Sequence, residues 1–138
     1  MNVLVCLDNK NGMLFAGRRQ STDSALRRRI LQLAGENRLW MNPYTARQFS
    51  SLPENICVED DFLSKADRGE YCFVENTDVR PFLGKIEHLI LYRWNRDYPS
   101  NVKFPLHLFQ NGWICKSRTE FAGTSHDVIT EEIYGYEP

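Results

Sequence analysis

The sequence predicts an α/β domain in which a mostly parallel sheet is completed by an antiparallel hairpin. Two observations predict this class. In the first part of the chain, short apolar runs typical of buried strands alternate with stretches of helical spacing, as in parallel sheets. From Glu87 onward the strand-like runs "EHLILYRWN", "GWICKSRTEF" and "DVITEEIYGY" follow one another without helices, which favours antiparallel pairing.

Length and composition indicate one domain, residues 1–138, of ordinary globular character, with 42% apolar and 25% charged residues. No apolar run approaches the roughly 20 residues that span a bilayer. The first ten residues lack the basic segment of a signal peptide. Four dispersed cysteines, at positions 6, 57, 72 and 115, predict a reduced cytoplasmic protein without a metal site. The net charge of −1 weighs against nucleic acid as a partner.

The first strand is "NVLVCLD", and it ends at the turn residues 8–12. The next stretch, "GMLFAGRRQSTD", has the character of a loop. A helix begins at Thr22 or Asp23, either of which can cap it, and ends at Gly35. After the strand "RLWM", Asn42-Pro43 opens a second helix, which we expect to run through Phe49.

The middle of the chain continues the alternation. The strands "NICVE" and "YCFVE" flank a helical turn that starts at Asp60 or Asp61 and extends through Ala66. Another helix is expected after Asn76, with Pro81 tolerated in its first turn. The three strands from Glu87 onward then complete the sheet.

The ordered set of motifs resembles dihydrofolate reductase. "DNKNGMLFAGRRQS" is similar to the family's first loop, D-x-x-x-G-I-G-x-x-G-x-L-P-W, "WMNPYT" to its I-M-G-R-x-T, and "FVEN" to its I-G-G. "LILYRWNRDYPSNVKFP" resembles its L-Y-L-T … D-T-x-F-P stretch, and "GWICKSRTEF…SHDVITEEIY" its final strands with a structural Ser-His pair. The likeness covers nearly the whole chain. It implies a three-layer αβα sandwich with a central mixed sheet of about eight strands.

The family's activity is hydride transfer from NADPH to dihydrofolate, yet the residues that bind NADPH are mostly replaced here. Glu75 and Asn76 stand where a glycine pair admits the cofactor pyrophosphate. In the G-R-x-T motif only the threonine, Thr45, is kept, because Asn42-Pro43 replaces Gly-Arg. The run 59–61, Glu-Asp-Asp, replaces the Ser and Arg that meet the 2′-phosphate. A carboxylate about 4 Å from a phosphate charge costs roughly 1 to 4 kcal/mol, depending on exposure.

The folate side is altered as well. The helix carboxylate that holds the pterin falls at Leu26 in strict register, and Asp23 takes its place only if the loop is three residues shorter. The other interpretation of Asp23 is a helix cap. The Pro-Trp pair that ends the family's first loop becomes Gln20-Ser21, and the threonine of L-Y-L-T becomes Tyr92.

We expect a cleft with apolar walls and a few polar groups, as small-molecule sites have. Its expected lining is Leu26, Met41, Thr45, Glu75, Asn76 and Tyr92, with Asp23 as the candidate catalytic carboxylate. The alternative is that Tyr92 and Met41 fill a closed core and that Glu75 caps a helix or forms a local ion pair.

Arginines form the second candidate site. Arg18 and Arg19 lie in the first loop, and Arg27, Arg28 and Arg29 lie on the first helix. If the loop folds over the helix, these guanidiniums converge and suit phosphate or carboxylate recognition. The alternative is a solvated helix face whose arginines pair with Glu36, Asp23 or Glu131.

The sequence therefore predicts a non-canonical member of the dihydrofolate reductase fold. It would bind a small ligand or a protein partner through the cleft and the arginine-rich loop, with no cofactor. Two alternatives stay open: an NAD(P)H-dependent oxidoreductase of pteridine-like substrates with Asp23 on the proton side, and a structural or assembly module. Whether the chain is an enzyme, and its oligomeric state, also stay open.

Overall fold

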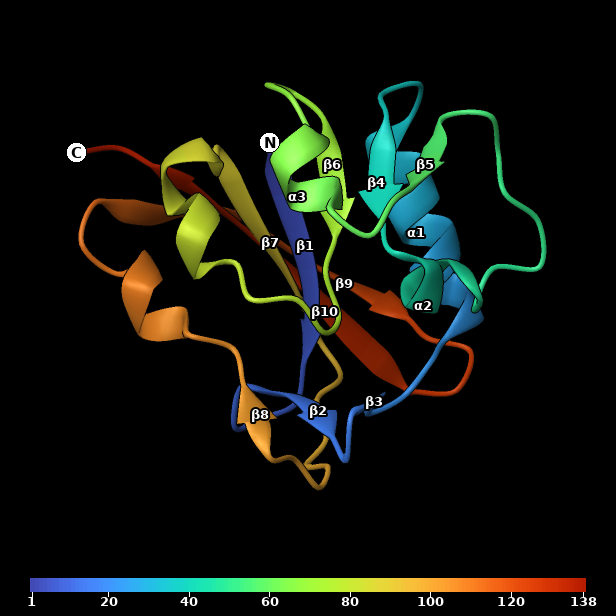
Figure 1. The fold of residues 1–138 in the computed structure, drawn as a ribbon. Helices are drawn as coiled ribbons and strands as arrows, with labels where there is room; N and C mark the ends of the chain where they lie inside the picture. Colours follow the sequence, from blue (N-terminus) through green and yellow to red (C-terminus); the bar gives the residue numbers. More distant parts are fainter.

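Seven strands form the central sheet of the computed structural model, which describes all 138 residues (Figure 1). Their spatial order is β5-β4-β6-β1-β7-β10-β9. The strands are β1 (Asn2–Leu7), β4 (Leu39–Met41), β5 (Ile56–Val58), β6 (Tyr71–Phe73), β7 (His88–Arg93), β9 (Trp113–Ala122) and β10 (Val128–Tyr136). The first five of these strands are parallel to one another, whereas β10 is antiparallel to both of its neighbours, β7 and β9. This confirms the mixed sheet with a C-terminal antiparallel hairpin, with seven strands where about eight were expected.

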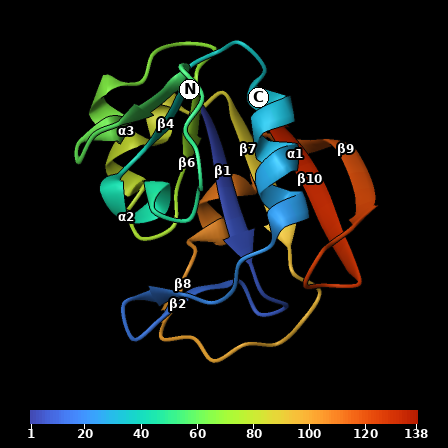
Figure 2. The same ribbon diagram turned by 90° about the vertical axis from the view of Figure 1, so that its right-hand side faces the viewer.

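Helices cover both faces of the sheet. Helix α1 (Ser24–Ala34) lies against one face (Figure 2). Short elements cover the other face: α3 (Phe62–Lys65) and the 3₁₀ helices η1 (Arg80–Lys85) and η2 (Leu106–Phe109). Because side chains alternate along a strand, Val3 and Val5 enter a core of 18 buried residues on one side, and Leu4 enters a core of 11 on the other. The three layers predicted from the resemblance are therefore present.

Helix α1 has the boundaries that its sequence predicts. The Asp23 carboxylate caps it by accepting hydrogen bonds from the backbone N–H of Ala25 at 2.9 Å and of Leu26 at 3.2 Å. Gly35 ends it with φ of 58°, a conformation that glycine adopts without a steric penalty. The buried residues Leu26, Ile30 and Ala34 are four residues apart and form one stripe against the sheet.

The stretch from Gly12 to Asp23, predicted as a loop, contains two strands, β2 (Gly12–Phe15) and β3 (Arg18–Arg19). With β8 (Val102–Lys103) they form a second, antiparallel sheet in the order β3-β2-β8. The partner β8 has two residues and no apolar run of its own, so local patterning gave no sign of it. A Cβ atom at Gly12 would lie 2.6 Å from Cβ of Ser100, so the close approach of this sheet to the segment before β8 requires glycine there.

Of two further predicted helices, the first is shorter than expected and the second is a 3₁₀ helix that begins later. Helix α2 spans Pro43–Ala46, with Asn42 as its cap through a 3.0 Å hydrogen bond from the Thr45 N–H. The residues after it, through Phe49, continue in tighter turns with i→i−3 hydrogen bonds. The helix predicted after Asn76 is the 3₁₀ helix η1, which begins at Arg80 and has Pro81 in its first turn. No helix in the structure is long and apolar enough to cross a bilayer.

Candidate functional site

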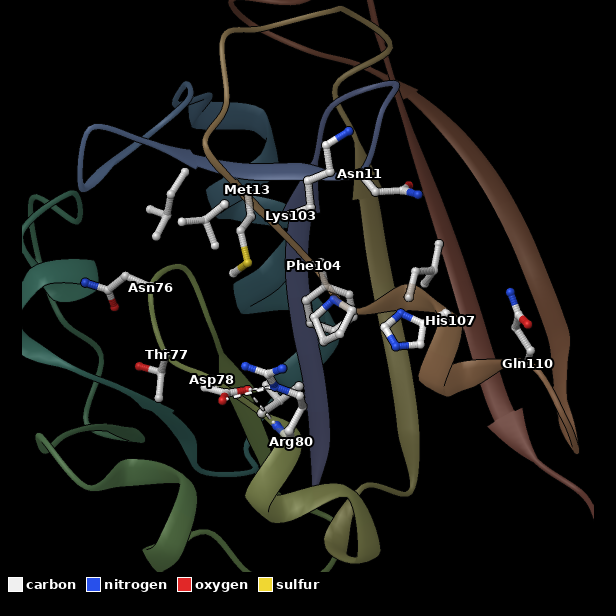
Figure 3. Close-up of a pocket in the computed structure, with 15 residues that line it drawn as sticks. Asn11, Met13, Asn76, Thr77, Asp78, Arg80, Lys103, Phe104, His107 and Gln110 are labelled. Carbon is white, nitrogen blue, oxygen red and sulfur yellow. Dashed lines mark hydrogen bonds and ion pairs between the residues drawn. The ribbon is translucent and has the colours of Figure 1, made fainter.

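A pocket of about 690 Å³ opens beside the end of β6, bounded by β2, the segment 76–80 and the segment from β8 to η2 (Figure 3). Six of its 15 lining residues are hydrophobic: Met13, Leu14, Val79, Val102, Phe104 and Leu106. The polar lining residues include Asn11, Asn76, Thr77, Asp78, Arg80, Lys103, His107 and Gln110. An apolar interior with a few converging polar groups is the usual makeup of a small-molecule site.

The charges around this pocket are unequal. Asp78 is its only carboxylate, and it accepts a hydrogen bond from Arg80 Nε at 3.0 Å. The Arg80 hydrogen bonds hold the pKa of Asp78 below its ordinary value. Lys103 has no ion pair and no side-chain hydrogen bond, and His107 likewise has no side-chain partner. The pocket therefore presents a net positive charge.

Glu75, two residues beyond the end of β6, is 8% exposed and is held by Arg19. Arg19 Nε donates to Oε2 of Glu75 at 3.0 Å and Arg19 Nη2 donates to Oε1 at 3.1 Å. Gln48 Nε2 adds a third donor at 3.1 Å, and the Arg19 guanidinium lies 4.2 Å from the centre of the Tyr44 ring. The carboxylate is therefore fully engaged by protein groups, as the alternative of a local ion pair expected.

Four of the residues expected to line the cleft lie inside the core instead. Leu26 is 2% exposed, and Met41, Thr45 and Tyr92 are each 0% exposed. The physical reason is that α1 packs directly on this face of the sheet and fills the space with its apolar stripe. Of the expected cleft residues, Asn76 is the one that lines the open pocket, and its Oδ1 accepts a hydrogen bond from Asn42 Nδ2 at 2.7 Å.

Asp23, the candidate catalytic carboxylate, is 1% exposed and saturated with donors. Besides capping α1, it accepts hydrogen bonds from the backbone N–H groups of Thr124 at 2.9 Å and Ser125 at 2.8 Å, and from His126 Nδ1 at 3.0 Å. Burial alone would raise the pKa of Asp23, but these hydrogen bonds outweigh burial and hold it far below its ordinary value. Asp23 thus joins the start of α1 to the β9–β10 hairpin and offers no free oxygen to a substrate.

The arginines do not converge. Arg19 is held by Glu75, and Arg29 makes two 2.8 Å hydrogen bonds to Glu131 on β10. Arg18, Arg27 and Arg28 form no ion pair. The first loop pairs with β8 in the small sheet instead of folding over α1. The arginines of the loop and those of α1 therefore do not form one site.

No protein-family model and no curated protein sequence matches the chain. Among solved structures, the chain is similar to a dihydrofolate reductase from Enterococcus faecalis complexed with NADP(H) and RAB-propyl. The TM-score is 0.70, and the match covers 99% of this chain and 96% of that one, at 11% sequence identity. The fold is that of dihydrofolate reductase. At so low an identity the likeness concerns the fold alone, and it confirms the architecture that the ordered motifs predicted.

Within this dihydrofolate reductase fold, the polar groups of the pocket other than Asn76 were missed at the level of sequence. Lys103 and Phe104 lie in "NVKFP", the stretch similar to the family's D-T-x-F-P, which was used only to support the fold. Arg80 and His107 belong to 3₁₀ helices, which have no clear periodic signature. The structure contains no group of three or more His, Cys, Asp or Glu side chains arranged to hold a metal ion.

Proposed function

We propose that the chain binds a small organic anion with an apolar body in the pocket beside β6, and that it does not reduce dihydrofolate with NADPH. The volume of about 690 Å³ lies within the range of about 300–1,000 Å³ that is usual for small-ligand sites. Met13, Leu14 and Phe104 provide apolar surface, and the unpaired Lys103 provides charge.

The preference for an anion rests on the balance of charge. Arg80 and Asp78 neutralise one another, so Lys103 adds an uncompensated positive charge. His107 adds an imidazole N–H as a second hydrogen-bond donor. A carboxylate or phosphate group is the ligand chemistry that such donors recognise.

The claim that the chain does not reduce dihydrofolate with NADPH rests on one observation, the Arg19–Glu75 ion pair. In the family a glycine pair at this strand end leaves bare backbone for the cofactor pyrophosphate. Here two side chains and the flanking Tyr44 and Gln48 occupy the strand end. The neighbouring loss of the phosphate-binding arginine to Pro43, and the exposed carboxylates at 59–61, also oppose NADPH.

A thermal-shift screen tests the proposal, using aromatic carboxylates, organic phosphates, pteridines and NADPH as probes. We expect an aromatic acid or an organic phosphate to raise Tm, and Lys103→Glu to abolish the rise. Lys10→Glu, an exposed change outside the pocket, is the matched control and should preserve the rise.

Other outcomes of this screen favour the other functions. Saturable NADPH binding, seen as quenching of the three tryptophans, would overturn the proposal in favour of an NAD(P)H-dependent oxidoreductase. A flat screen together with a stable dimer in light scattering would favour an assembly module. The saturation of Asp23 by five protein donors weighs against the oxidoreductase, because that reaction needs Asp23 as its proton-side carboxylate.

A further inference from the structure

Three side chains from distant parts of the chain form a hydrogen-bonded series: Tyr98, His126 and Asp23. The Tyr98 hydroxyl lies 2.8 Å from His126 Nε2, and His126 Nδ1 lies 3.0 Å from Oδ2 of Asp23. The Trp94 ring stacks on the imidazole with 4.5 Å between ring centres and an interplanar angle of 22°. His126 is 3% exposed, so its ring is held on both edges and one face.

The hydrogen-bond directions in this series follow from Asp23. Its carboxylate is ionised and accepts every bond that it makes, so His126 Nδ1 must donate to it. In the neutral imidazole, Nε2 is then the bare nitrogen, and the Tyr98 hydroxyl donates to it. A hydroxyl bonded to a base, which a carboxylate orients in turn, is the arrangement that activates nucleophiles.

Tyr98 also lines an open hollow of about 380 Å³ on the side of the molecule that carries the first loop. Phe15 and Pro99 give this hollow apolar surface. Arg18 lines it too, and its guanidinium is exposed and without an ion pair. None of these residues lines the larger pocket beside β6. The hollow is therefore a separate site, and the half-buried Tyr98 and the exposed Arg18 both line it.

We infer that Tyr98 is an activated nucleophile that takes the acyl group of an ester whose acyl part carries a carboxylate or phosphate bound by Arg18. The Tyr98 oxygen bonds to the ester carbonyl carbon while its proton passes to His126 Nε2. The bond from that carbon to the leaving oxygen breaks, and the leaving alkoxide takes the proton back from the imidazolium. Water then hydrolyses the acylated Tyr98, with His126 as the base, releases the acid and restores the phenol.

Acylation by p-nitrophenyl esters, with peptide mass spectrometry to locate the acyl group, tests this inference on the full chain. Tyr136 serves as an internal control for the acylation rate in the unaltered protein, because it is 53% exposed and has no imidazole partner. We expect p-nitrophenyl acetate to acylate Tyr98 at least about tenfold faster than Tyr136. Acylation that follows exposure, with Tyr136 ahead of Tyr98, would overturn the inference without any variant.

Substitutions separate the chemical role of His126 from a structural one. His126→Gly should slow the acylation of Tyr98 by about a hundredfold, and added imidazole should restore part of the rate. A rate that does not change in His126→Gly would contradict the inference. Thr124→Ala removes the neighbouring 2.7 Å bond from Ser24 to Thr124, which also joins α1 to the hairpin, but keeps the Tyr98–His126–Asp23 series. It is the matched control and should acylate normally.

The charge of the ester tests Arg18. The mono-p-nitrophenyl ester of glutaric acid, whose acyl part carries a carboxylate, should acylate Tyr98 faster than the neutral acetate. Arg18→Gln should remove that preference, so that the ratio of the glutarate rate to the acetate rate falls to about one or below, because the variant has no guanidinium for the ester carboxylate. If Arg18→Gln prefers the glutarate ester over the acetate ester as strongly as the unaltered protein does, Arg18 does not bind the carboxylate of the ester. None of these readouts depends on the pocket beside β6, so its failure as a ligand site would leave this test intact.

Discussion

Arg19 and Glu75, which are 56 residues apart, are joined by three hydrogen bonds of 3.0 to 3.2 Å between one guanidinium and one carboxylate. The side chain of Glu75 is 7% exposed and that of Arg19 21%. The pair therefore links the small sheet to the end of β6 in surroundings that solvent screens only in part. Glu75, the polar residue that ends the run "YCFVE", thus forms its ion pair with an arginine of the first loop.

Glu75→Ala should destabilise the fold, because it leaves the Arg19 guanidinium without its carboxylate. We expect a loss of about 2 kcal/mol in the free energy of unfolding, measured by urea denaturation. Lys65→Ala, which breaks the exposed pair of Lys65 with Glu59, is the matched control and should cost much less, because solvent screens that pair. If the two substitutions lower the free energy of unfolding equally, the buried Arg19–Glu75 pair stabilises the fold no more than an exposed pair does.

The chain should show no saturable binding of NADPH in the micromolar range, and the double substitution Glu75→Gly with Asn76→Gly should not create it. Restoring the glycines removes two side chains, but Pro43 and the carboxylates at 59–61 remain. Quenching of tryptophan fluorescence during NADPH titration measures this directly. Measurable affinity in the double variant would mean that Glu75 and Asn76 alone exclude the cofactor.

Stability should fall in acid, and Glu131 should account for part of the loss. Burial alone would raise the pKa of Glu131, but hydrogen bonds from Arg29 and Tyr92 outweigh burial and hold it below 4.5, its ordinary value. A carboxyl whose pKa is lowered by folding stabilises the fold above its unfolded pKa, and that contribution is lost as the pH falls through the folded pKa. Urea midpoints should therefore stay level near neutral pH and decrease below about pH 4.5. Glu131→Gln should show a shallower decrease, and an unchanged pH profile in that variant would contradict this assignment.

Asp23→Ala should be among the most destabilising polar substitutions, because it leaves five donors of α1 and the hairpin without their acceptor. We expect a loss of about 3 kcal/mol, measured by urea denaturation. Ser24→Ala, which removes one exposed hydrogen bond to Thr124 at the same junction, should cost less than about 1 kcal/mol. A mild effect of Asp23→Ala would indicate that its hydrogen bonds are readily replaced by water.

The architecture was predictable because it depends on patterns that are local and repeated along the chain. The cap at Asp23 and the stop at Gly35 can both be identified within a few residues of the helix. The pairing of β2 with β8 could not be identified from the sequence, because β8 is two residues long and its partner β2 lies far away along the chain. Short strands of this kind are defined by what they pair with, not by their own composition.

The candidate sites were less predictable because their residues meet only through the fold. Tyr98 and His126 are 28 residues apart, and His126 and Asp23 are 103 apart. No spacing rule connects them. Conversely, Tyr92 and Met41 were placed at a cleft from their register, but helix packing decides exposure, and α1 buries them both. Register along a strand determines which face a side chain is on, and not whether that face is open.

The order of strands in the sheet has a consequence for how the chain is made. Strand β1 lies at the centre, yet its neighbour β7 is residues 88–93, and the next strand in the sheet, β10, ends at Tyr136. Arg29 and Asp23, near the start of the chain, likewise have partners at residues 124–131: Arg29 binds Glu131, and Asp23 accepts three of its five donors from there. Contacts between such distant segments close slowly, and they cannot form while the later segment is still inside the ribosome. The sheet therefore cannot be completed before residues 128–136 have left the ribosome, and until then the unpaired strand edges of the nascent chain are exposed to aggregation.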